Sequence, residues 1–373
     1  MKQLRTIELA RAKILVRAPN WIGDAVMCLP ALYELRRALP EAELVLVARP
    51  WVLELFPAEE LRCRTVPYDT RGPHRGLGGR WRIAAELRQE KFHAAILFQN
   101  AFDAALLAAM AGIPIRAGYA RHGRRLLLTH PVRVPRRGEI PRHESHYYLE
   151  LLRRLGLIER YSEVGEILLP LSGSSRAAAR ARLEEALAPR LAQPLHGKLL
   201  VGISPGATFG TAKRWPAERF AQLALRLSGE LGAVPIFFGS SQEAPLVESL
   251  LPHAGSAAVS LAGTTSLSEF MRLVPGCDLY VVNDTGTMHV AAALGVPTFA
   301  IFGPTDEQAT RPLGPRVRLA VGSAFCRPCL LRHCPIDHRC MTSVSVEEVF
   351  ESAWSFLQQS QTERLAWQEN YAR

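Results

Sequence analysis

Residues 278–303 read DLYVVNDTGTMHVAAALGVPTFAIFG, and this stretch decides the fold class. An apolar strand over 278–284 leads through a short turn into a helix over 287–294. A second apolar strand follows the turn Gly295-Val296-Pro297. Apolar strands joined through a helix are typical of a parallel sheet with both faces covered. We therefore expect an α/β architecture here.

The same alternation runs outward from this stretch in both directions. In the second half we expect strands at 198–204, 234–239 and 258–261, and helices at 176–187, 217–231, 242–250 and 267–274. In the first half we expect strands at 13–17, 43–48, 94–98 and 115–119, and helices at 25–39, 50–55, 81–90, 101–111 and 143–155. The pattern predicts two Rossmann-like domains that face a central cleft.

The domain boundary is placed at the Gly-, Ser- and Pro-rich segment PLSGSS, residues 170–175. Residues 1–172 form the N-terminal domain and residues 173–373 the C-terminal domain, whose last helix is expected to pack back on the N-terminal one. A length of 373 residues suits two domains. The longest apolar stretch, residues 94–115, contains Gln99, Asn100 and Asp103 and does not suit a membrane span. The first residues contain no apolar signal segment, so we expect a cytoplasmic protein.

The charge of the chain is unevenly distributed. The net charge is +10, with hydrophobic residues at 48% and charged residues at 21%, which excludes a disordered chain. Residues 1–172 hold 27 basic and 18 acidic side chains, whereas the remainder is nearly balanced. Either the first half has an Arg-rich solvated surface, or it binds an anionic partner such as nucleic acid, a membrane surface or a phosphorylated substrate.

Four of the seven cysteines lie close together in the sequence. Cys326, Cys329, Cys334 and Cys340 have the spacing C-x2-C-x4-C-x5-C, with His333 and His338 nearby. This spacing differs from a paired zinc ribbon, although four thiolates can close a structural metal site. Reduced thiols and a local crosslink are the alternatives. Nothing in the pattern indicates a catalytic metal.

Two turns in the second half have the composition of a phosphate site, although neither a Gly-x-Gly-x-x-Gly fingerprint nor a P-loop is present. Asp284, Thr285 and Gly286 end a strand just before a helix, where free N–H groups attract anions, and His289 follows one turn later. The turn PGATFGTAKRWP brings Lys213 after another strand. The alternative is a capped helix and a solvated lysine. Two such turns at one sheet edge favour a diphosphate pocket.

One carboxylate in the first half has a comparable position. Asp24 in PNWIGDAV lies where the first strand turns into the first helix. As a helix cap it would contribute about 1 kcal/mol. As a general base it would deprotonate an acceptor hydroxyl, which is the one proton transfer that an inverting sugar transfer requires.

Four segments together resemble the ADP-heptose:lipopolysaccharide heptosyltransferases, glycosyltransferase family 9, and heptosyltransferase II more than heptosyltransferase I. They are KILVRAPNWIGDAVMCLPAL, FQNAFDAALLAAMAGIPIRAGY, SPGATFGTAKRWPAERFAQLA and NDTGTMHVAAALGVPTFAIFGPTD. The resemblance runs from Lys13 to Val349 in the family's order. It implies a GT-B glycosyltransferase that inverts the anomeric centre, requires no cofactor and takes ADP-heptose as donor substrate.

The resemblance also assigns roles to residues. Asp24 matches the family's base, and the donor contacts fall on Lys213, Glu243, Asp284, Thr285, Gly286 and His289. The acceptor would be heptosyl-Kdo2-lipid A at the cytoplasmic face of the inner membrane, reached by peripheral membrane contact and without nucleic acid. The acceptor candidates are basic residues of the first half: Arg71, Arg75, Arg80, Arg121, Arg124 and Arg125.

Two alternatives stay open. A related transferase could use a different nucleotide-diphosphate sugar or core acceptor, because sugar choice depends on a few pocket side chains. A noncatalytic nucleotide- or nucleic-acid-binding protein would use the basic half, although few aromatic residues accompany its arginines.

Overall fold

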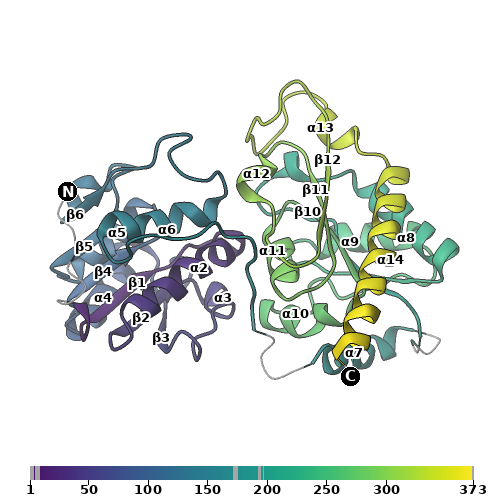
Figure 1. Ribbon diagram of the computed structural model, residues 1–373. Coiled ribbons are helices and arrows are strands. Elements are labelled where there is room, and N and C mark those ends of the chain that lie inside the picture. Colours follow the sequence, from purple (N-terminus) through teal and green to yellow (C-terminus); the bar gives the residue numbers. More distant parts are fainter. Residues whose placement is uncertain (1–3, 5–8, 171–174, 192–194, 196, 372–373) are drawn as a thin grey trace. The chain divides into compact units, whose positions relative to one another are not determined.

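The computed structural model describes residues 4, 9–170, 175–191, 195 and 197–371, with side chains up to Gln359. It divides into two compact units, Met1–Ile167 and Leu168–Arg373, each an α/β unit (Figure 1). The division falls a few residues before the expected linker. Residues 171–174 of that linker, and with them the expected boundary, lie outside the described residues.

Unit 1 is built on a six-stranded sheet in the order β3-β2-β1-β4-β5-β6, in which all neighbouring strands are parallel. Its strands are β1 (Lys13–Arg17), β2 (Glu43–Ala48), β3 (Cys63–Pro67), β4 (Ala94–Leu97), β5 (Ile115–Tyr119) and β6 (His130–Val132). Its helices are α2 (Ile22–Ala38), α3 (Pro50–Leu53), α4 (Gly76–Gln89), α5 (Phe102–Met110), η1 (Arg124–Leu127) and α6 (Glu144–Leu155).

Unit 2 repeats the same plan with the order β12-β11-β10-β7-β8-β9, again with parallel neighbours. Its strands are β7 (Leu200–Ser204), β8 (Val234–Phe237), β9 (Val259–Ser260), β10 (Leu279–Asn283), β11 (Thr298–Phe302) and β12 (Val317–Val321). Its longer helices are α7 (Arg176–Leu187), α8 (Ala217–Leu231), α9 (Ala244–Leu250), α10 (Leu267–Leu273), α11 (Gly286–Ala293) and α14 (Val346–Tyr371). The short ones are η2 (Ala188–Arg190), η3 (Thr211–Lys213), η4 (Leu251–His253), η5 (Val274–Gly276), α12 (Glu307–Thr310) and α13 (Arg339–Thr342).

The two strand orders confirm the expected fold class, because each is the doubly wound order of a Rossmann sheet. In such a sheet the chain leaves the first strand in one direction and the fourth strand in the other. Ligands bind at this switch point, beyond the carboxyl ends of the two strands. The switch point lies between β1 and β4 in unit 1 and between β7 and β10 in unit 2.

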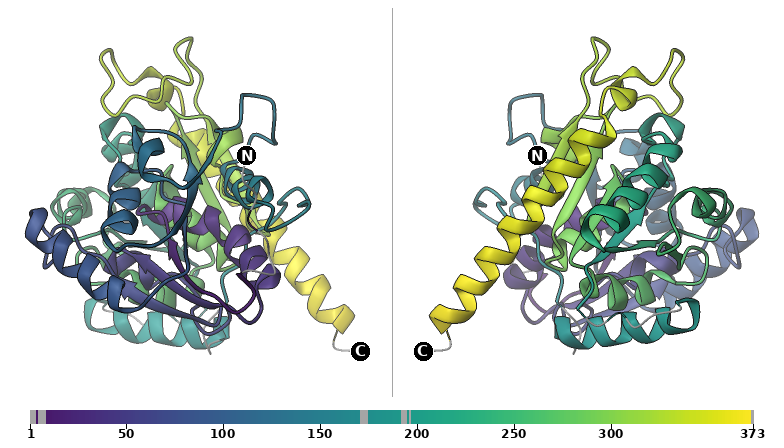
Figure 2. Two further views of the ribbon diagram at one scale, coloured as in Figure 1. Left: turned by 90° about the vertical axis from the view of Figure 1, so that its left-hand side faces the viewer. Right: turned by 90° about the vertical axis from the view of Figure 1, so that its right-hand side faces the viewer.

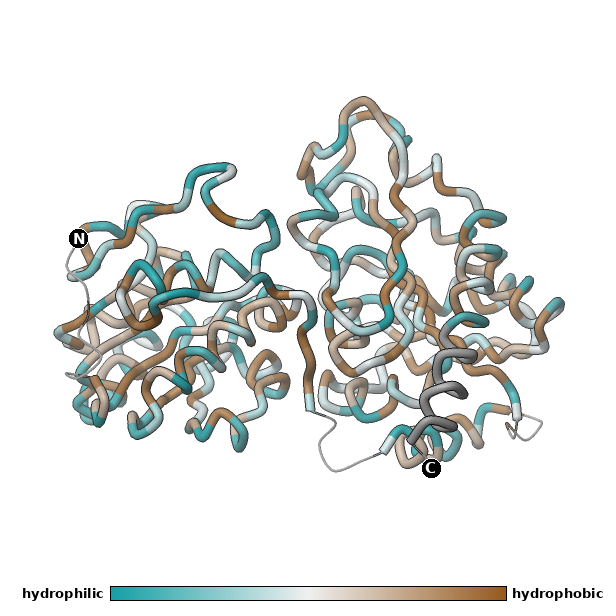
Figure 3. Tube along the Cα trace, in the orientation of Figure 1, coloured by the Kyte–Doolittle hydropathy of each residue, from teal (hydrophilic) through white to brown (hydrophobic). Residues whose placement is uncertain are grey.

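The central strands are buried because they are apolar on both faces. β2, β4, β7, β10 and β11 are buried along all or nearly all of their length, and Figure 3 shows apolar residues along the strands of both units. Helices supply the rest of each core. In unit 2 the first half of α14 contributes Val349, Phe350, Ala353, Phe356 and Leu357 at helical spacing, and α14 packs against α8 (Figure 2).

Sequence patterns missed some elements at the edges of the sheets. The edge strands β3, β6 and β12 lack the buried apolar run of a central strand, so periodicity did not reveal them. The helix expected at 81–90 begins earlier, because residues 76–80 form the first turn of α4. A Cβ atom on Gly79 would lie 2.4 Å from the backbone of His74, so a glycine is what lets this turn pack closely.

No helix in the described part of the chain is long and apolar enough to cross a bilayer.

Candidate functional site

In unit 2 the two expected phosphate turns meet at the switch point. One follows β7 and the other follows β10, and the buried side chain of Asn283 joins them. Its Nδ2 donates to the carbonyl oxygens of Pro205 at 2.9 Å and Gly206 at 3.3 Å, and its Oδ1 accepts from the Trp215 N–H at 3.0 Å. Sequence analysis gave Asn283 no role. The amide fixes both turns to one strand end.

Lys213 and Asp284, which were predicted separately, form a buried ion pair. Lys213 Nζ lies 2.6 Å from Asp284 Oδ2, and Asp284 is 4% exposed. The Thr305 hydroxyl donates to the same oxygen at 2.6 Å. A buried carboxylate needs hydrogen bonds that compensate for its lost hydration. The hydroxyl of Thr305, another residue that sequence analysis missed, supplies one of them.

The first residues of α11, the helix that follows Asp284, are partly exposed. Thr285 is the N-cap of α11 without a side-chain capping bond, and Gly286 begins the helix. Both are partly exposed, whereas His289, one turn later, is 4% exposed. Exposed N–H groups at a helix N-terminus bind anions. The expected donor residues thus comprise a partly exposed helix N-terminus beside the Lys213–Asp284 ion pair.

Glu243 lies next to the turn that follows β7. Its Oε2 accepts from the Ser240 N–H at 2.9 Å and the Ser240 hydroxyl at 2.8 Å. A Cβ atom on Gly206 would lie 1.9 Å from Glu243 Oε1, so a larger residue there would displace this carboxylate. The structure therefore brings Glu243, the N-cap of α9, against the turn after β7.

The cysteine-rich segment, residues 326–340, contacts the turn that carries Lys213. Arg332 accepts a backbone hydrogen bond from Ala212 at 3.0 Å, and its guanidinium lies 5.0 Å from the centre of the Phe209 ring. Lys213 Nζ lies 4.9 Å from the same centre. Contacts of cations with an aromatic face contribute about 0.5–2 kcal/mol. Phe209 thus has contacts with cations from two separate segments.

In unit 1, Asp24 is the third residue of α2 and follows β1 at the switch point. It is partly buried, and the helix α6 packs along α2. Glu144, the first residue of α6, lies close enough for the Asp24 charge to act on it. Burial, and then the charge of Asp24, raise the pKa of Glu144 to about 7, while Arg121 opposes the shift.

The two residues one turn further on repeat this proximity. Cys28 and Tyr148 are buried, and the Asp24 charge raises the pKa of each, after burial as the larger cause. The N-terminal turns of α2 and α6 therefore lie side by side, with a carboxylate on each. Sequence analysis missed Glu144, because an acidic residue in a first helical turn is common in any helix.

A family model described as glycosyltransferase family 9 (heptosyltransferase) matches residues 80–339. The chain belongs to glycosyltransferase family 9. It is 30% identical to lipopolysaccharide heptosyltransferase 2 of Escherichia coli over 312 residues, which are 82% of this chain and 87% of that protein. The expected family, and with it the expectation of a glycosyltransferase, is confirmed.

Solved structures of this family share the fold. E. coli ADP-heptose lps heptosyltransferase II superposes with a TM-score of 0.75 at 26% identity, covering 94% of this chain and 99% of that one. E. coli heptosyltransferase WaaC with ADP-2-deoxy-2-fluoro heptose superposes with a TM-score of 0.63 at 18% identity, covering 91% and 98%. The second likeness concerns the fold alone.

The six arginines expected at the acceptor differ in their surroundings. Arg71, Arg75, Arg121 and Arg125 are exposed. Arg80 pairs with Asp103, with 2.6 Å between Nε and Oδ1. Arg124 is fully buried and donates to the carbonyl oxygens of Tyr119 and Gln99 and, at 3.0 Å, to Asn100 Oδ1. Arg124 holds the β5–η1 connection together, so the expectation that it contacts the acceptor does not fit its position.

The four clustered cysteines lie near one another in this family member. Burial raises the pKa of Cys340, and the charges of Cys326, Cys329 and Cys334 add to the shift. All seven cysteines are free thiols. Among the residues described, no three Cys, His, Asp or Glu side chains are arranged to hold a metal ion. Metal binding by these thiols stays a prediction.

Proposed function

We propose that the chain transfers L-glycero-D-manno-heptose from ADP-heptose to heptosyl-Kdo2-lipid A, the inner core of lipopolysaccharide, with inversion at the anomeric carbon. The observation that carries the donor half is the buried Lys213–Asp284 pair beside the open N-terminus of α11, at the switch point of unit 2. This arrangement suits a diphosphate, which needs a fixed cation and free N–H donors. The heptosyltransferase 2 relative supports the choice of sugar and of acceptor class.

In this proposal the donor contacts divide between two parts of ADP-heptose. The diphosphate is held by Lys213 and by the backbone at Thr285 and Gly286. His289 is buried and lies one helical turn after them. Glu243 accepts from the ribose hydroxyls, since a carboxylate accepts hydrogen bonds and Ser240 holds this one in place. These protein groups stabilise the leaving diphosphate, so we propose that no cofactor is required.

The acceptor half of the proposal assigns the proton transfer to Asp24. Its carboxylate removes the proton from the acceptor hydroxyl while that oxygen attacks the anomeric carbon and ADP departs. The acceptor is a membrane glycolipid, so we propose peripheral contact with the cytoplasmic face of the inner membrane. The basic excess of residues 1–172 supports this, because it attracts anionic groups.

A transfer assay with defined substrates tests the function. The full chain is incubated with ADP-heptose and heptosyl-Kdo2-lipid A, and the mass of the lipid and the release of ADP are followed. We expect one added heptose and no transfer from UDP- or GDP-sugars. Transfer from another nucleotide sugar would replace the proposed donor. Salt-sensitive binding of generic DNA without any transfer would favour the noncatalytic alternative.

The Asp24–Glu144 pair predicts a pH dependence of turnover. Above a pH of about 7 Glu144 is ionised, and its charge makes Asp24 a stronger base, because like charges disfavour double ionisation. We expect wild-type kcat to rise through this pH. Glu144→Gln should abolish the rise, with similar kcat at pH 6 and about two- to fivefold lower kcat at pH 8, because the base then lacks the neighbouring negative charge.

The pH dependence of protein stability provides a second test of the Asp24–Glu144 pair. Because the folded state binds the Glu144 proton more tightly than the unfolded state, stability is lost as pH rises towards 7. Glu144→Gln should therefore raise the melting temperature at pH 8 and leave it unchanged at pH 4. Glu159→Gln, an exposed carboxylate beyond the same helix, is the control. An unchanged pH profile in Glu144→Gln would separate Glu144 from the base.

A further inference from the structure

Unit 1 has a hollow of about 650 Å³ beside the edge strand β6. Its walls come from the end of β5, from η1, from β6 and from the loop after β6. Arg125, His130, Arg133 and Arg136 contribute its charged and titratable side chains. The other lining residues are a threonine and small or apolar residues, and no carboxylate is among them. The composition indicates a site for an anion.

Two of these arginines have no carboxylate partner within the described part of the chain. Arg133 pairs with Glu139 at 2.6 Å, whereas the guanidinium groups of Arg125 and Arg136 form no ion pair there. Both are exposed to solvent. A guanidinium offers five N–H donors in a planar fork that matches phosphate and carboxylate oxygens. The two side chains therefore keep their donors available for a ligand.

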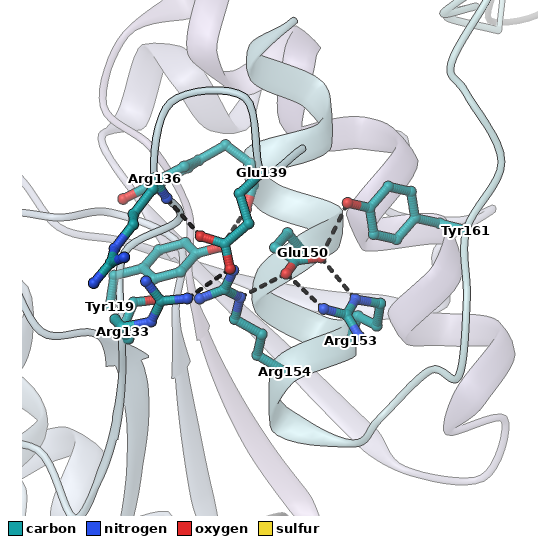
Figure 4. A network of polar contacts seen from close by, with 9 residues as sticks. Tyr119, Arg133, Arg136, Glu139, Glu150, Arg153, Arg154 and Tyr161 are labelled. Carbon is teal, nitrogen blue, oxygen red and sulfur yellow. Dashed lines mark hydrogen bonds and ion pairs between the residues drawn. The ribbon is translucent and has the colours of Figure 1, made fainter. Parts of the chain in front are cut away.

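A network of polar contacts fixes the loop that carries Arg133 and Arg136 (Figure 4). Glu139 Oε1 accepts from Arg133 and from Arg154, each at 2.6 Å, and its Oε2 accepts from the Arg136 N–H at 2.7 Å. Arg154 belongs to α6 and also pairs with the buried Glu150 at 2.5 Å. The backbone N–H of Arg136, followed by the neighbouring guanidinium groups, holds the pKa of Glu139 below its ordinary value.

This network positions the arginines before any ligand arrives. The loop is tied to α6, so its ordering does not have to be supplied by the ligand. α6 is also the helix that begins with Glu144, next to Asp24. Arg121 follows the lining residue Ala120, contacts the Tyr147 hydroxyl at 3.3 Å and acts on Glu144. The segment that lines the hollow at Ala120 thus continues into a residue that acts on Glu144.

We propose that this hollow binds phosphate or carboxylate groups on the sugar headgroup of the acceptor, with Arg125 and Arg136 as the direct ligands. The proposal rests on the proposed function and specifies its acceptor site. It replaces Arg124, which is buried, by Arg136, which the sequence did not single out. Arg133 holds the loop through Glu139 and adds charge.

Calorimetry with the deacylated, phosphorylated acceptor headgroup tests the proposal on the full chain. Arg125→Gln/Arg136→Gln removes the two ligands and leaves the Glu139 network intact. We expect at least tenfold weaker headgroup binding, unchanged ADP binding and a smaller loss of affinity with added salt than in the wild type. Arg11→Gln/Arg37→Gln is the matched control, because it removes the same charge from exposed surface pairs of the same unit.

Two further arms separate the sources of the anion. A headgroup without its phosphates shows which groups the arginines bind, since carboxylates remain. Vesicles of phosphatidylglycerol and phosphatidylcholine test whether the arginines bind bulk membrane lipid instead. Equal headgroup affinity in the double variant and the control would overturn the proposal, as would a loss confined to anionic vesicles. If the wild type binds no headgroup, the proposed acceptor itself is wrong; if it does and the variant binds equally, only the hollow is wrong.

Discussion

Replacing Asp24 by asparagine should lower kcat by about 100-fold or more, the scale expected for a lost general base. The amide keeps the size and much of the hydrogen-bonding capacity of the carboxylate but cannot accept the acceptor's proton. The KM for ADP-heptose and the Kd for ADP should change little, because the donor residues belong to unit 2. Steady-state and single-turnover kinetics with the purified chain measure both quantities.

The competing explanation for Asp24 is a structural one, and it predicts different results. As an acidic residue in the first turn of α2, Asp24 would contribute about 0.3–1 kcal/mol to stability. Asparagine would lose this small charge effect on stability, whereas turnover would stay near the wild-type value. Asp24→Asn with normal kcat would therefore reject the base. Glu159→Gln, which removes an exposed carboxylate of the same unit and leaves Asp24 in place, is the control.

Replacing Lys213 by alanine should weaken ADP binding about 10- to 100-fold, because a lost charged hydrogen bond costs about 1.5–3 kcal/mol. Adenosine, which lacks the diphosphate, should bind almost as before. The variant should also be less stable, since Asp284 would remain buried without its cation. Calorimetry with ADP and adenosine, together with thermal unfolding, separates the two effects. Lys198→Ala, an exposed lysine of the same unit, is the control.

A double variant distinguishes two roles of Lys213: binding the diphosphate, and neutralising the charge of Asp284. Lys213→Met/Asp284→Asn removes both charges, so it should recover the stability that Lys213→Ala loses. Its ADP affinity should stay low, because no ammonium group remains to meet the diphosphate. Recovery of ADP affinity in the double variant would mean that Lys213 only compensates Asp284. Equal losses for ADP and adenosine in Lys213→Ala would place the lysine away from the phosphates.

The strand–helix units could be predicted because their signal is local. The apolar run at 279–283, the glycine at 286 and the helical spacing after it specify one β-turn-α unit within a dozen residues. Parallel strands then bring all such turns to one edge of a sheet, so the grouping of Lys213 with Asp284 follows from the fold class. Edge strands carry a weaker signal, and β3, β6 and β12 were missed for that reason.

The remaining features depend on packing between segments that are distant in the sequence. Arg124 and Arg125 are adjacent and of the same residue type. The first is buried and donates to the carbonyl oxygen of Tyr119 at the end of β5, whereas the second lines the hollow. No local pattern distinguishes them, because the direction of each side chain is set by the turn that η1 makes. Glu144 and Thr305 likewise gain their partners only when α6 meets α2 and when the turn after β11 meets β10.

The sequence by itself therefore determined the two Rossmann-like sheets, the family and the turns that carry Asp24, Lys213 and Asp284. Periodicity and turn residues act over a few positions, and such signals can be read along the chain. Only the tertiary structure decided which charges are buried, which are paired and which stay open to a ligand. The free energy of a charged side chain depends on its solvent exposure and its partners, and folding supplies both.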